Sequence, residues 1–397
     1  MAIQSTPDFA PLDPAALERS LAPFGHSRML PKDAYISQDV FEWEKRNFFE
    51  RGWMCVGFAA DIAKPGDQRA ESVGTGGVLL LRGQDSVLRA FANVCSHRGH
   101  ELLPCGETAN HGRIICPYHS WAYDLEGNVA TAPSFGTVKG FDKSAHGLVQ
   151  LPCVEWHGLI FVDASGEAPP LEAQLADLSE IVAPYEPERL VITGRHDYVV
   201  DANWKTLTEN YHECYHCPMI HPQLCEVSDP KSGDTYSTDG PWAGGTMDLR
   251  DGLDTMSLDG QSSGVPLRGL SEEQLRIIIY VNVFPNILIS LHPDYVMVHR
   301  LTPLAAGSTR IECIWAFAPE SFEREGFDPS YGMGFWDLTN QQDWDACASV
   351  HRGLSSPHAV PGPLATEEEV VYEFVTMVAR GYKGEPVRNV KQPVHHR

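Results

Sequence analysis

Two short segments of this 397-residue chain combine cysteine and histidine at close spacing. In the first, one residue separates Cys95 from His97; in the second, two residues separate Cys116 from His119. Each pair follows a short run of β-forming residues, so we expect both pairs at the tips of hairpin loops. Two loops that face each other would present two thiolates and two imidazoles to one metal centre.

This set of ligands suits either a tetrahedral zinc ion or an iron–sulfur cluster. Zinc sites of the finger type usually place two cysteines in one half and two histidines in the other. Here each half supplies one residue of each type. That arrangement favours a Rieske 2Fe–2S centre, in which two cysteines bind one iron and two histidines bind the other. A structural zinc site is the alternative.

A second segment, residues 203–222, is dense in other ligand types. Glu213 and His216 are three residues apart, so they share a face wherever the segment is helical. His221 follows five residues after His216, a spacing that a straight helix would splay. Pro218 breaks the helical hydrogen-bond ladder and allows a bent turn that brings the two histidines together.

Two histidines and one carboxylate form the facial triad of non-haem Fe(II) oxygenases, which leaves coordination positions open for O₂ and substrate. The residues alone do not single out the carboxylate. Glu209 and Glu213 are local candidates, and Asp343 on a predicted long helix is the best distant one. The competing interpretation is a surface helix whose Glu and His side chains face solvent.

The elements that must position these groups follow from apolar patterning. From residue 53 to 163, short β-rich runs alternate with glycine turns, which predicts an all-β domain of hairpins. Further along, consecutive long strands joined by turns predict an antiparallel sheet. Helices are expected over 203–217 and over 335–352, the latter with Gly353 as its C-cap, and a long loop is expected over 228–274.

Composition excludes several classes of partner. Asp and Glu number 53 against 30 Lys and Arg, for a net charge of −23, which argues against nucleic acid and anionic membranes. The first residues lack a secretory pattern, and proline and asparagine interrupt the most apolar stretch, so no membrane span is expected. Ten cysteines then fit a reducing, cytoplasmic location, where clustered Cys and His are metal ligands rather than disulfides.

Together the two motifs resemble the Rieske non-haem iron oxygenase family, the α subunits of ring-hydroxylating and related oxygenases. The resemblance extends over nearly the whole chain and includes Asn-Trp-Lys at 203–205 and Glu-Asn-Tyr at 209–211. It implies a 2Fe–2S cluster with the ligands Cys95, His97, Cys116 and His119. It also implies a mononuclear Fe(II) held by His216, His221 and Asp343, with Asp345 as the fallback carboxylate.

The resemblance implies further roles at the iron. Glu213 occupies the position of an acidic residue that bridges the first iron histidine to a cluster histidine of a neighbouring subunit, here His119. Such a bridge fixes the imidazole tautomer and links the two redox sites. Because the two sites of one chain are too far apart in this family, a head-to-tail homotrimer is implied. Asn210 is placed with Glu213 among the catalytic residues.

The implied fold is of the α+β class. An all-β Rieske 2Fe–2S domain over 46–163 is inserted beside a helix-grip, START-like catalytic domain over 164–397, which has a central antiparallel sheet. Residues 1–45 are expected to pack on the catalytic domain.

Within the family, the Glu-Cys-Tyr-His-Cys run at 213–217 is similar to the betaine, carnitine and stachydrine oxygenases. This similarity implies a monooxygenase or dioxygenase that hydroxylates or N-demethylates a small quaternary ammonium compound. O₂ is the co-substrate, and a reductase or ferredoxin delivers electrons that come ultimately from NAD(P)H. The alternatives are an oxygenase of aromatic carboxylates, a non-catalytic Rieske electron carrier and a zinc-stabilised binding protein.

An aromatic cage would bind such a cation through the faces of its rings. Aromatic residues at these spacings more often belong to the core. The candidates for the cage are Tyr211, Trp242, Tyr280, Phe284 and Tyr295.

Overall fold

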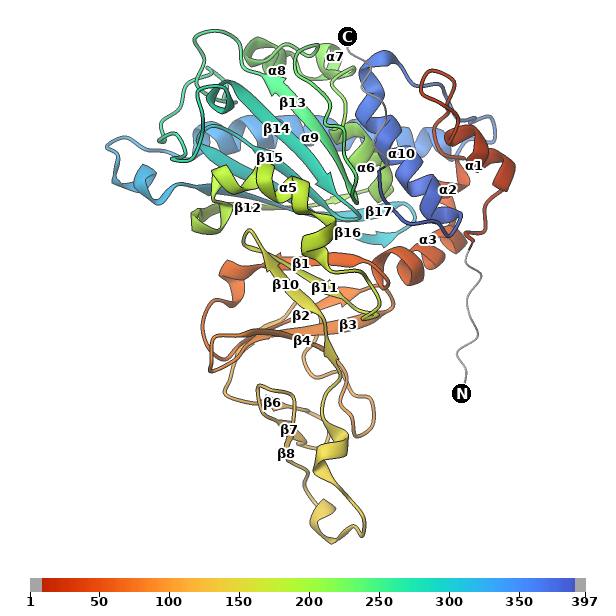
Figure 1. The fold of residues 1–397 in the computed structure, drawn as a ribbon, viewed down its shortest axis with the longest axis vertical. Helices are drawn as coiled ribbons and strands as arrows, with labels where there is room; N and C mark the ends of the chain where they lie inside the picture. Colours follow the sequence, from red (N-terminus) through yellow and green to blue (C-terminus); the bar gives the residue numbers. More distant parts are fainter. Residues whose placement is uncertain (1–8, 390–397) are drawn as a thin grey trace. The chain divides into compact units, whose positions relative to one another are not determined.

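The computed structural model describes residues 9–389 and divides the chain into two compact units. The β-rich unit comprises residues 44–171, and the mixed unit comprises the residues before 44 together with those from 172 onward. The β-rich unit is therefore inserted into the sequence of the mixed unit (Figure 1). Within residues 9–389, no helix is both long and apolar enough to cross a membrane.

The β-rich unit consists of three small antiparallel sheets. The first has the order β1 (Trp53–Phe58), β11 (Leu159–Asp163), β10 (Cys153–Trp156). The second has the order β5 (Thr108–Asn110), β2 (Asp67–Val73), β3 (Gly76–Arg82), β4 (Leu88–Ala92), β9 (Gln150–Leu151). The third has the order β6 (Ile114–Ile115), β7 (Ala122–Tyr123), β8 (Val129–Thr131).

The mixed unit is built on a six-stranded antiparallel sheet. Its order is β12 (Val191–Val200), β17 (Ser308–Phe317), β16 (Tyr295–Ala305), β15 (Ile287–Leu291), β14 (Ile277–Val283), β13 (Trp242–Asp248). Its helices are α1 (Pro14–Ser20), α2 (Asp33–Ile36), α3 (Gln38–Glu44), α5 (Ala176–Val182), α6 (Trp204–Tyr211), α7 (Cys217–Ile220), α8 (Pro222–Val227), α9 (Ser330–Leu354) and α10 (Glu369–Tyr382). The short helix α4 (Leu171–Gln174) begins where the two units meet in sequence.

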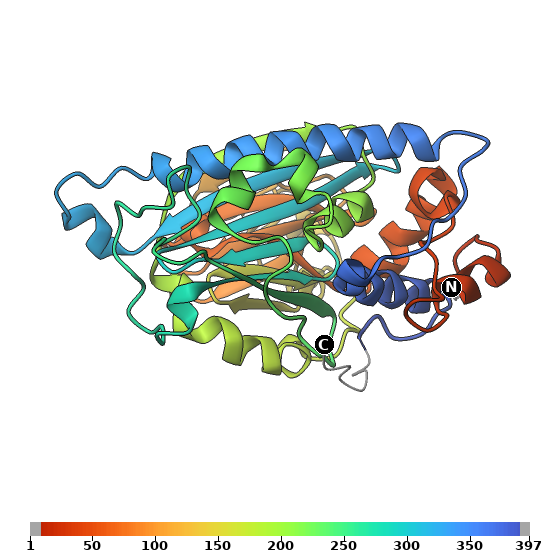
Figure 2. The same cartoon turned by 90° about the horizontal axis from the view of Figure 1, so that it is seen from above.

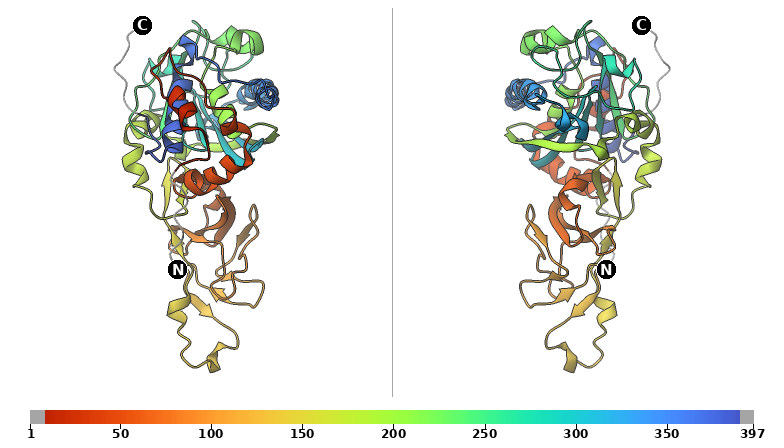
Figure 3. Two further views of the ribbon diagram at one scale, coloured as in Figure 1. Left: turned by 90° about the vertical axis from the view of Figure 1, so that its right-hand side faces the viewer. Right: turned by 90° about the vertical axis from the view of Figure 1, so that its left-hand side faces the viewer.

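The long helix α9 runs along one face of this sheet, and α5 lies on the opposite side (Figures 2 and 3). Met297, Trp315 and Phe317 project from the sheet into a buried cluster, and Met333 and Trp336 of α9 pack against it. Removing these large side chains from water is the main force that holds α9 on the sheet. The predicted α+β class, with antiparallel sheets and an all-β unit, is confirmed.

Two local predictions were wrong. The region 228–274 is not a continuous loop, because it contains β13, in which Gly244 and Gly245 pair with β14 and hide the strand signal. Glycine is required there, since a Cβ on Gly244 would lie 2.3 Å from the carbonyl oxygen of Tyr280. Helix α9 also continues through Gly353 to Leu354, and Ser355 is its C-cap.

A buried carboxylate ties the segment between β13 and β14 to the rest of the mixed unit. Asp294, in the turn between β15 and β16, is 1% exposed and accepts a hydrogen bond of 2.6 Å from the Thr255 hydroxyl. The hydroxyls of Ser262 and of Tyr331 in α9 also donate to it. Burial raises the pKa of Asp294, and the hydrogen bonds from these hydroxyl donors stabilise its charged form.

We expect Asp294→Ala to destabilise the protein by about 3 kcal/mol, because it leaves buried hydroxyl groups without an acceptor. The measurement is the midpoint of urea unfolding. Asp251→Ala changes an exposed carboxylate in the same connecting segment and is the matched control. Equal midpoints for the two variants would show that Asp294 does not anchor this segment.

Candidate metal centres

The chain that carries the two histidines of the mixed unit is a series of short helices separated by turns. Helix α6 begins at its N-cap Asn203, whose side chain accepts the Lys205 N–H at 3.0 Å, and it ends at Tyr211. The predicted helix over 203–217 is therefore too long. His221 lies at the break between α7 and α8, because Pro222 disfavours a helical conformation of the residue before it.

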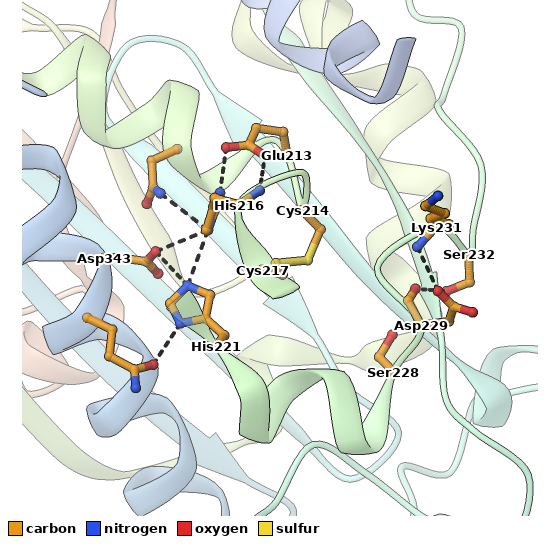
Figure 4. Close-up of a disulfide and its surroundings, with 12 residues drawn as sticks. Glu213, Cys214, His216, Cys217, His221, Ser228, Asp229, Lys231, Ser232 and Asp343 are labelled. Atoms are coloured by element: carbon orange, nitrogen blue, oxygen red, sulfur yellow. Dashed lines mark hydrogen bonds and ion pairs between the residues drawn. A yellow bond between two sulfur atoms is a disulfide. The ribbon is translucent and has the colours of Figure 1, made fainter. Parts of the chain in front are cut away.

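This break directs both imidazoles at the same point as a carboxylate of α9 (Figure 4). His216 Nε2 lies 3.2 Å from His221 Nε2, and Asp343 Oδ1 lies 3.3 Å and 2.8 Å from these two nitrogens. Metal–ligand bonds of about 2.1 Å at right angles would place neighbouring donor atoms about 3 Å apart. The three side chains thus fit one face of the coordination sphere of a divalent ion such as Fe(II).

The structure does not bring the other candidate carboxylates to this point. The carboxylate of Glu209 is buried and accepts a 2.7 Å hydrogen bond from the Tyr35 hydroxyl, and burial raises its pKa to about 8. Glu213 contacts the far nitrogen of His216, and Asp345 is exposed. Among the candidates, only Asp343 adjoins both histidines.

The outer nitrogen of each imidazole has an oxygen partner. His216 Nδ1 lies 2.5 Å from Glu213 Oε1, and His221 Nδ1 lies 2.7 Å from Gln342 Oε1. If each Nδ1–H donates to these oxygens, each Nε2 keeps its lone pair for the metal. Sequence analysis missed Gln342, whose only signal is that it directly precedes Asp343.

The electrostatics of the triad favour a bound cation. Burial lowers the pKa of His216, but Asp343 and Glu213 outweigh burial and raise it to about 9. Burial likewise raises the pKa of Asp343, yet its hydrogen bonds to the two histidines hold it below the usual value. The site therefore stabilises positive charge, which a divalent metal would supply in place of protons. The side-chain amide of Asn210 lies 3.4 Å from His216 Nε2, at the metal-facing side.

In the β-rich unit, the other four predicted ligands lie in loops after β4 and β6. Cys95 and Cys116 are 2% and 1% exposed, whereas His97 and His119 are only partly buried, with ring centroids 4.7 Å apart. Burial raises the pKa of the Cys116 thiol, and the neighbouring Cys95 thiol adds to this rise. The Tyr123 hydroxyl lies 3.1 Å from Cys95 Sγ.

These donors fit a cluster better than a single ion. Within residues 9–389, no three of the four ligand atoms lie within 4.8 Å of one another, as one zinc ion would require. A 2Fe–2S cluster spans a larger distance and takes the thiols on one iron and the imidazoles on the other. The Nδ1 atom of His97 is buried and has no hydrogen-bond partner in the described structure, which suits a metal ligand.

One expectation about the cysteines was wrong. The structure joins Cys214 and Cys217 in a disulfide, whereas clustered cysteines were expected to be metal ligands (Figure 4). These two residues flank His216 in sequence, and neither belongs to the metal triad.

The five aromatic candidates do not form one cage. The rings of Tyr211 and Tyr280 lie 6.1 Å apart, and the Tyr211 hydroxyl donates to the Ile289 carbonyl at 2.7 Å. Trp242 pairs with Val283, three residues after Tyr280 on β14. Since side chains alternate along a strand, Trp242 and Val283 lie on the opposite face of the sheet from Tyr280. The remaining two make ring contacts elsewhere: Phe284 with Trp204, and Tyr295 with His292, Phe317 and Tyr331.

Comparisons with known proteins agree with both sites. The model of the ring hydroxylating alpha subunit (catalytic domain) matches residues 187–384, and that of the Rieske [2Fe-2S] domain matches residues 52–142. The glycine betaine monooxygenase oxygenase subunit of Chromohalobacter salexigens is 29% identical over 386 residues, which cover 88% of this chain and 86% of the relative. The carnitine monooxygenase oxygenase subunit of Escherichia coli is 39% identical over 209 residues, which cover 52% of this chain and 55% of the relative.

Solved structures extend this similarity to three dimensions. The quaternary ammonium Rieske monooxygenase CntA in complex with L-carnitine superposes with a TM-score of 0.75 at 26% identity, over 94% of this chain and 99% of the other. Naphthalene 1,2-dioxygenase from Rhodococcus sp. shares the fold, with a TM-score of 0.76 at 19% identity over 94% of this chain and 97% of the other.

We expect Gln342→Leu to weaken Fe(II) binding about 10- to 100-fold, because His221 loses the partner that fixes its tautomer. Anaerobic calorimetric titration of the iron-depleted protein measures this affinity. Gln341→Leu is the control, since Gln341 is exposed and hydrogen-bonds Asp337 in the same helix. An unchanged affinity for Gln342→Leu would contradict a positioning role.

Proposed function

Because this chain belongs to the family of ring-hydroxylating oxygenase α subunits that carry a Rieske 2Fe–2S domain, we propose that it hydroxylates or N-demethylates a small quaternary ammonium compound. The chain is an iron-dependent oxygenase, and its cofactors are the cluster and a mononuclear iron. The observation that best supports an iron-dependent oxygenation is the convergence of His216, His221 and Asp343 on one point. The relatives that act on glycine betaine and carnitine support the substrate class.

When bound, the cluster supplies single electrons and the iron supplies O₂ activation, so that one oxygen atom enters the substrate and the other leaves as water. The chain's own residues organise this chemistry. His216, His221 and Asp343 would hold the metal from one side, and its other positions would stay available for O₂ and substrate. With Glu213 and Gln342 as acceptors for the two Nδ1 protons, each Nε2 would keep its lone pair for the metal.

Glu213 is also the proposed route for electrons between subunits. Its Oε1 is already bonded to His216, and the second carboxylate oxygen accepts the backbone N–H of His216 at 3.1 Å. His119 of a neighbouring subunit in a head-to-tail homotrimer would complete the link. A solved quaternary ammonium Rieske monooxygenase is described in terms of inter-subunit electron transfer, which supports this arrangement. A reductase or ferredoxin partner, fed by NAD(P)H in the cytoplasm, completes the proposal.

A quaternary ammonium group limits the contacts that a binding site can make with it. It has no N–H, so aromatic faces are its main favourable contact. Tyr211 and Tyr280 are the two candidates that lie together, and the hydrogen bond of the Tyr211 hydroxyl fixes its ring. The net charge of −23 also favours a cationic over an anionic substrate.

With a surrogate reductase, we expect O₂ uptake to depend on betaines or carnitine and not on aromatic carboxylates. Formaldehyde release, measured alongside, separates N-demethylation from hydroxylation that stops at the carbon. Tyr280→Leu should raise KM at least about 5-fold through loss of the ring face, whereas Tyr280→Phe keeps it near the original value. Uptake with aromatic acids alone would favour the other branch of the family.

Electron transfer between subunits is tested by complementation. His119→Ala disables the cluster and Asp343→Ala disables the iron site, so each variant alone should be inactive. In a co-expressed mixture, about a quarter of the interfaces of random head-to-tail trimers pair an intact cluster with an intact iron site. We therefore expect about a quarter of the original activity. No gain over the separate variants would rule out transfer across the interface.

A further inference from the structure

The turn that carries His216 is closed by a disulfide between Cys214 and Cys217, at a sequence separation of 3. No other disulfide joins cysteines within residues 9–389. The oxygenase reaction, as derived above, uses neither sulfur atom. The pair therefore calls for a separate explanation.

The two sulfur atoms have different surroundings. Cys217 is 2% exposed and packs in a buried cluster with Leu224, Val227 and Phe335. Cys214 is only partly buried and lines a pocket of 130 Å³ beside Glu213. A reagent in this pocket can reach Cys214 first, and Cys217 then lies close enough to react with it.

The charges that line the pocket favour one kind of reagent over another. Three carboxylates, Glu213, Asp234 and Glu367, line the pocket against the single ammonium group of Lys231. This balance disfavours an anion such as glutathione and suits a small neutral oxidant.

We propose that Cys214 and Cys217 form a redox modification site, at which hydrogen peroxide converts two thiols into the disulfide that closes the His216 turn. The thiolate of Cys214 attacks one peroxide oxygen, the O–O bond breaks, and a sulfenic acid and one water form. The sulfur of Cys217 then attacks the sulfenic sulfur, the S–S bond forms, the S–O bond breaks, and a second water leaves. The two sulfurs lose two electrons, the peroxide gains them, and both thiol protons end in water.

The modification acts on the metal site through the backbone. Besides the disulfide, hydrogen bonds close the turn, namely His216 N–H to the Glu213 carboxylate and Cys217 N–H to the Cys214 carbonyl. The disulfide restricts the opened turn and so disfavours the state from which His216 would release iron. For so short a loop we expect iron release to slow about tenfold.

Mass spectrometry of the full-length holoenzyme tests the modification. After treatment with a phosphine reductant, both thiols should be alkylated. When the reduced protein is treated with hydrogen peroxide before alkylation, Cys214 and Cys217 should carry no alkyl group, and their peptide should be two hydrogens lighter than the dithiol. Cys225 should still be alkylated. Dimedone should label Cys214 in Cys217→Ser, where no partner resolves the sulfenic acid, but should not label the buried Cys217 in Cys214→Ser. Cys225→Ser, on the nearby helix α8, is the matched control and should behave as the original protein.

A second readout follows mononuclear iron as it passes to a ferrous chelator, with the visible absorbance of the cluster monitored to exclude cluster loss. Once ascorbate, which leaves the disulfide intact, has returned the iron to the ferrous state, the peroxide-treated protein should release iron about tenfold more slowly than the reduced protein, and Cys225→Ser should show the same ratio. Two thiols that remain fully alkylated after peroxide, or dimedone on Cys217 alone, would overturn the modification site. Equal release rates would overturn its effect on the turn.

Discussion

Asp343 and the two histidines are separated by more than a hundred residues of sequence, yet His221 Nε2 and Asp343 Oδ1 lie 2.8 Å apart. A carboxylate in this largely buried position would be costly without positive partners. The imidazoles provide them, as the lowered pKa of Asp343 and the raised pKa of His216 indicate. The packing of α9 on the sheet and beside α6 brings these charges together. A divalent metal would replace the protons and keep the same balance.

Around this centre, one turn performs several tasks. Glu213 bonds both the imidazole and the backbone N–H of His216, which fixes the ring and the peptide at once. The same carboxylate is the proposed electron link. The disulfide between Cys214 and Cys217 closes the turn on the side away from the triad. Concentrating these groups in one turn means that any change in its conformation alters the metal site directly.

The β-rich unit solves a different problem, since a redox cluster must be protected and yet accessible to electrons. Its two thiols are buried, and the two imidazoles are partly exposed. The ring of His97 stacks on Trp121 with centroids 5.0 Å apart, which holds it in one orientation. The exposed side is therefore the histidine side, where electrons can leave towards an acceptor.

The sequence by itself determined the local groups: the two Cys–His pairs, the Glu213–His216 pair and the presence of a bend before His221. These depend on spacings of a few residues, which local backbone geometry translates directly into position. Resemblance to a family added Asp343, which spacing alone left among several carboxylates.

Only the tertiary structure decided the rest. It selected Asp343 over Glu209 and brought Gln342 to His221. It joined Cys214 to Cys217, and it placed Trp242 on the face of the sheet opposite to Tyr280. Most of these outcomes depend on how α9, α6 and the sheet pack together across long stretches of sequence. Such contacts arise from the burial of large side chains on one particular face, and no local pattern of residues records which partner that face will meet.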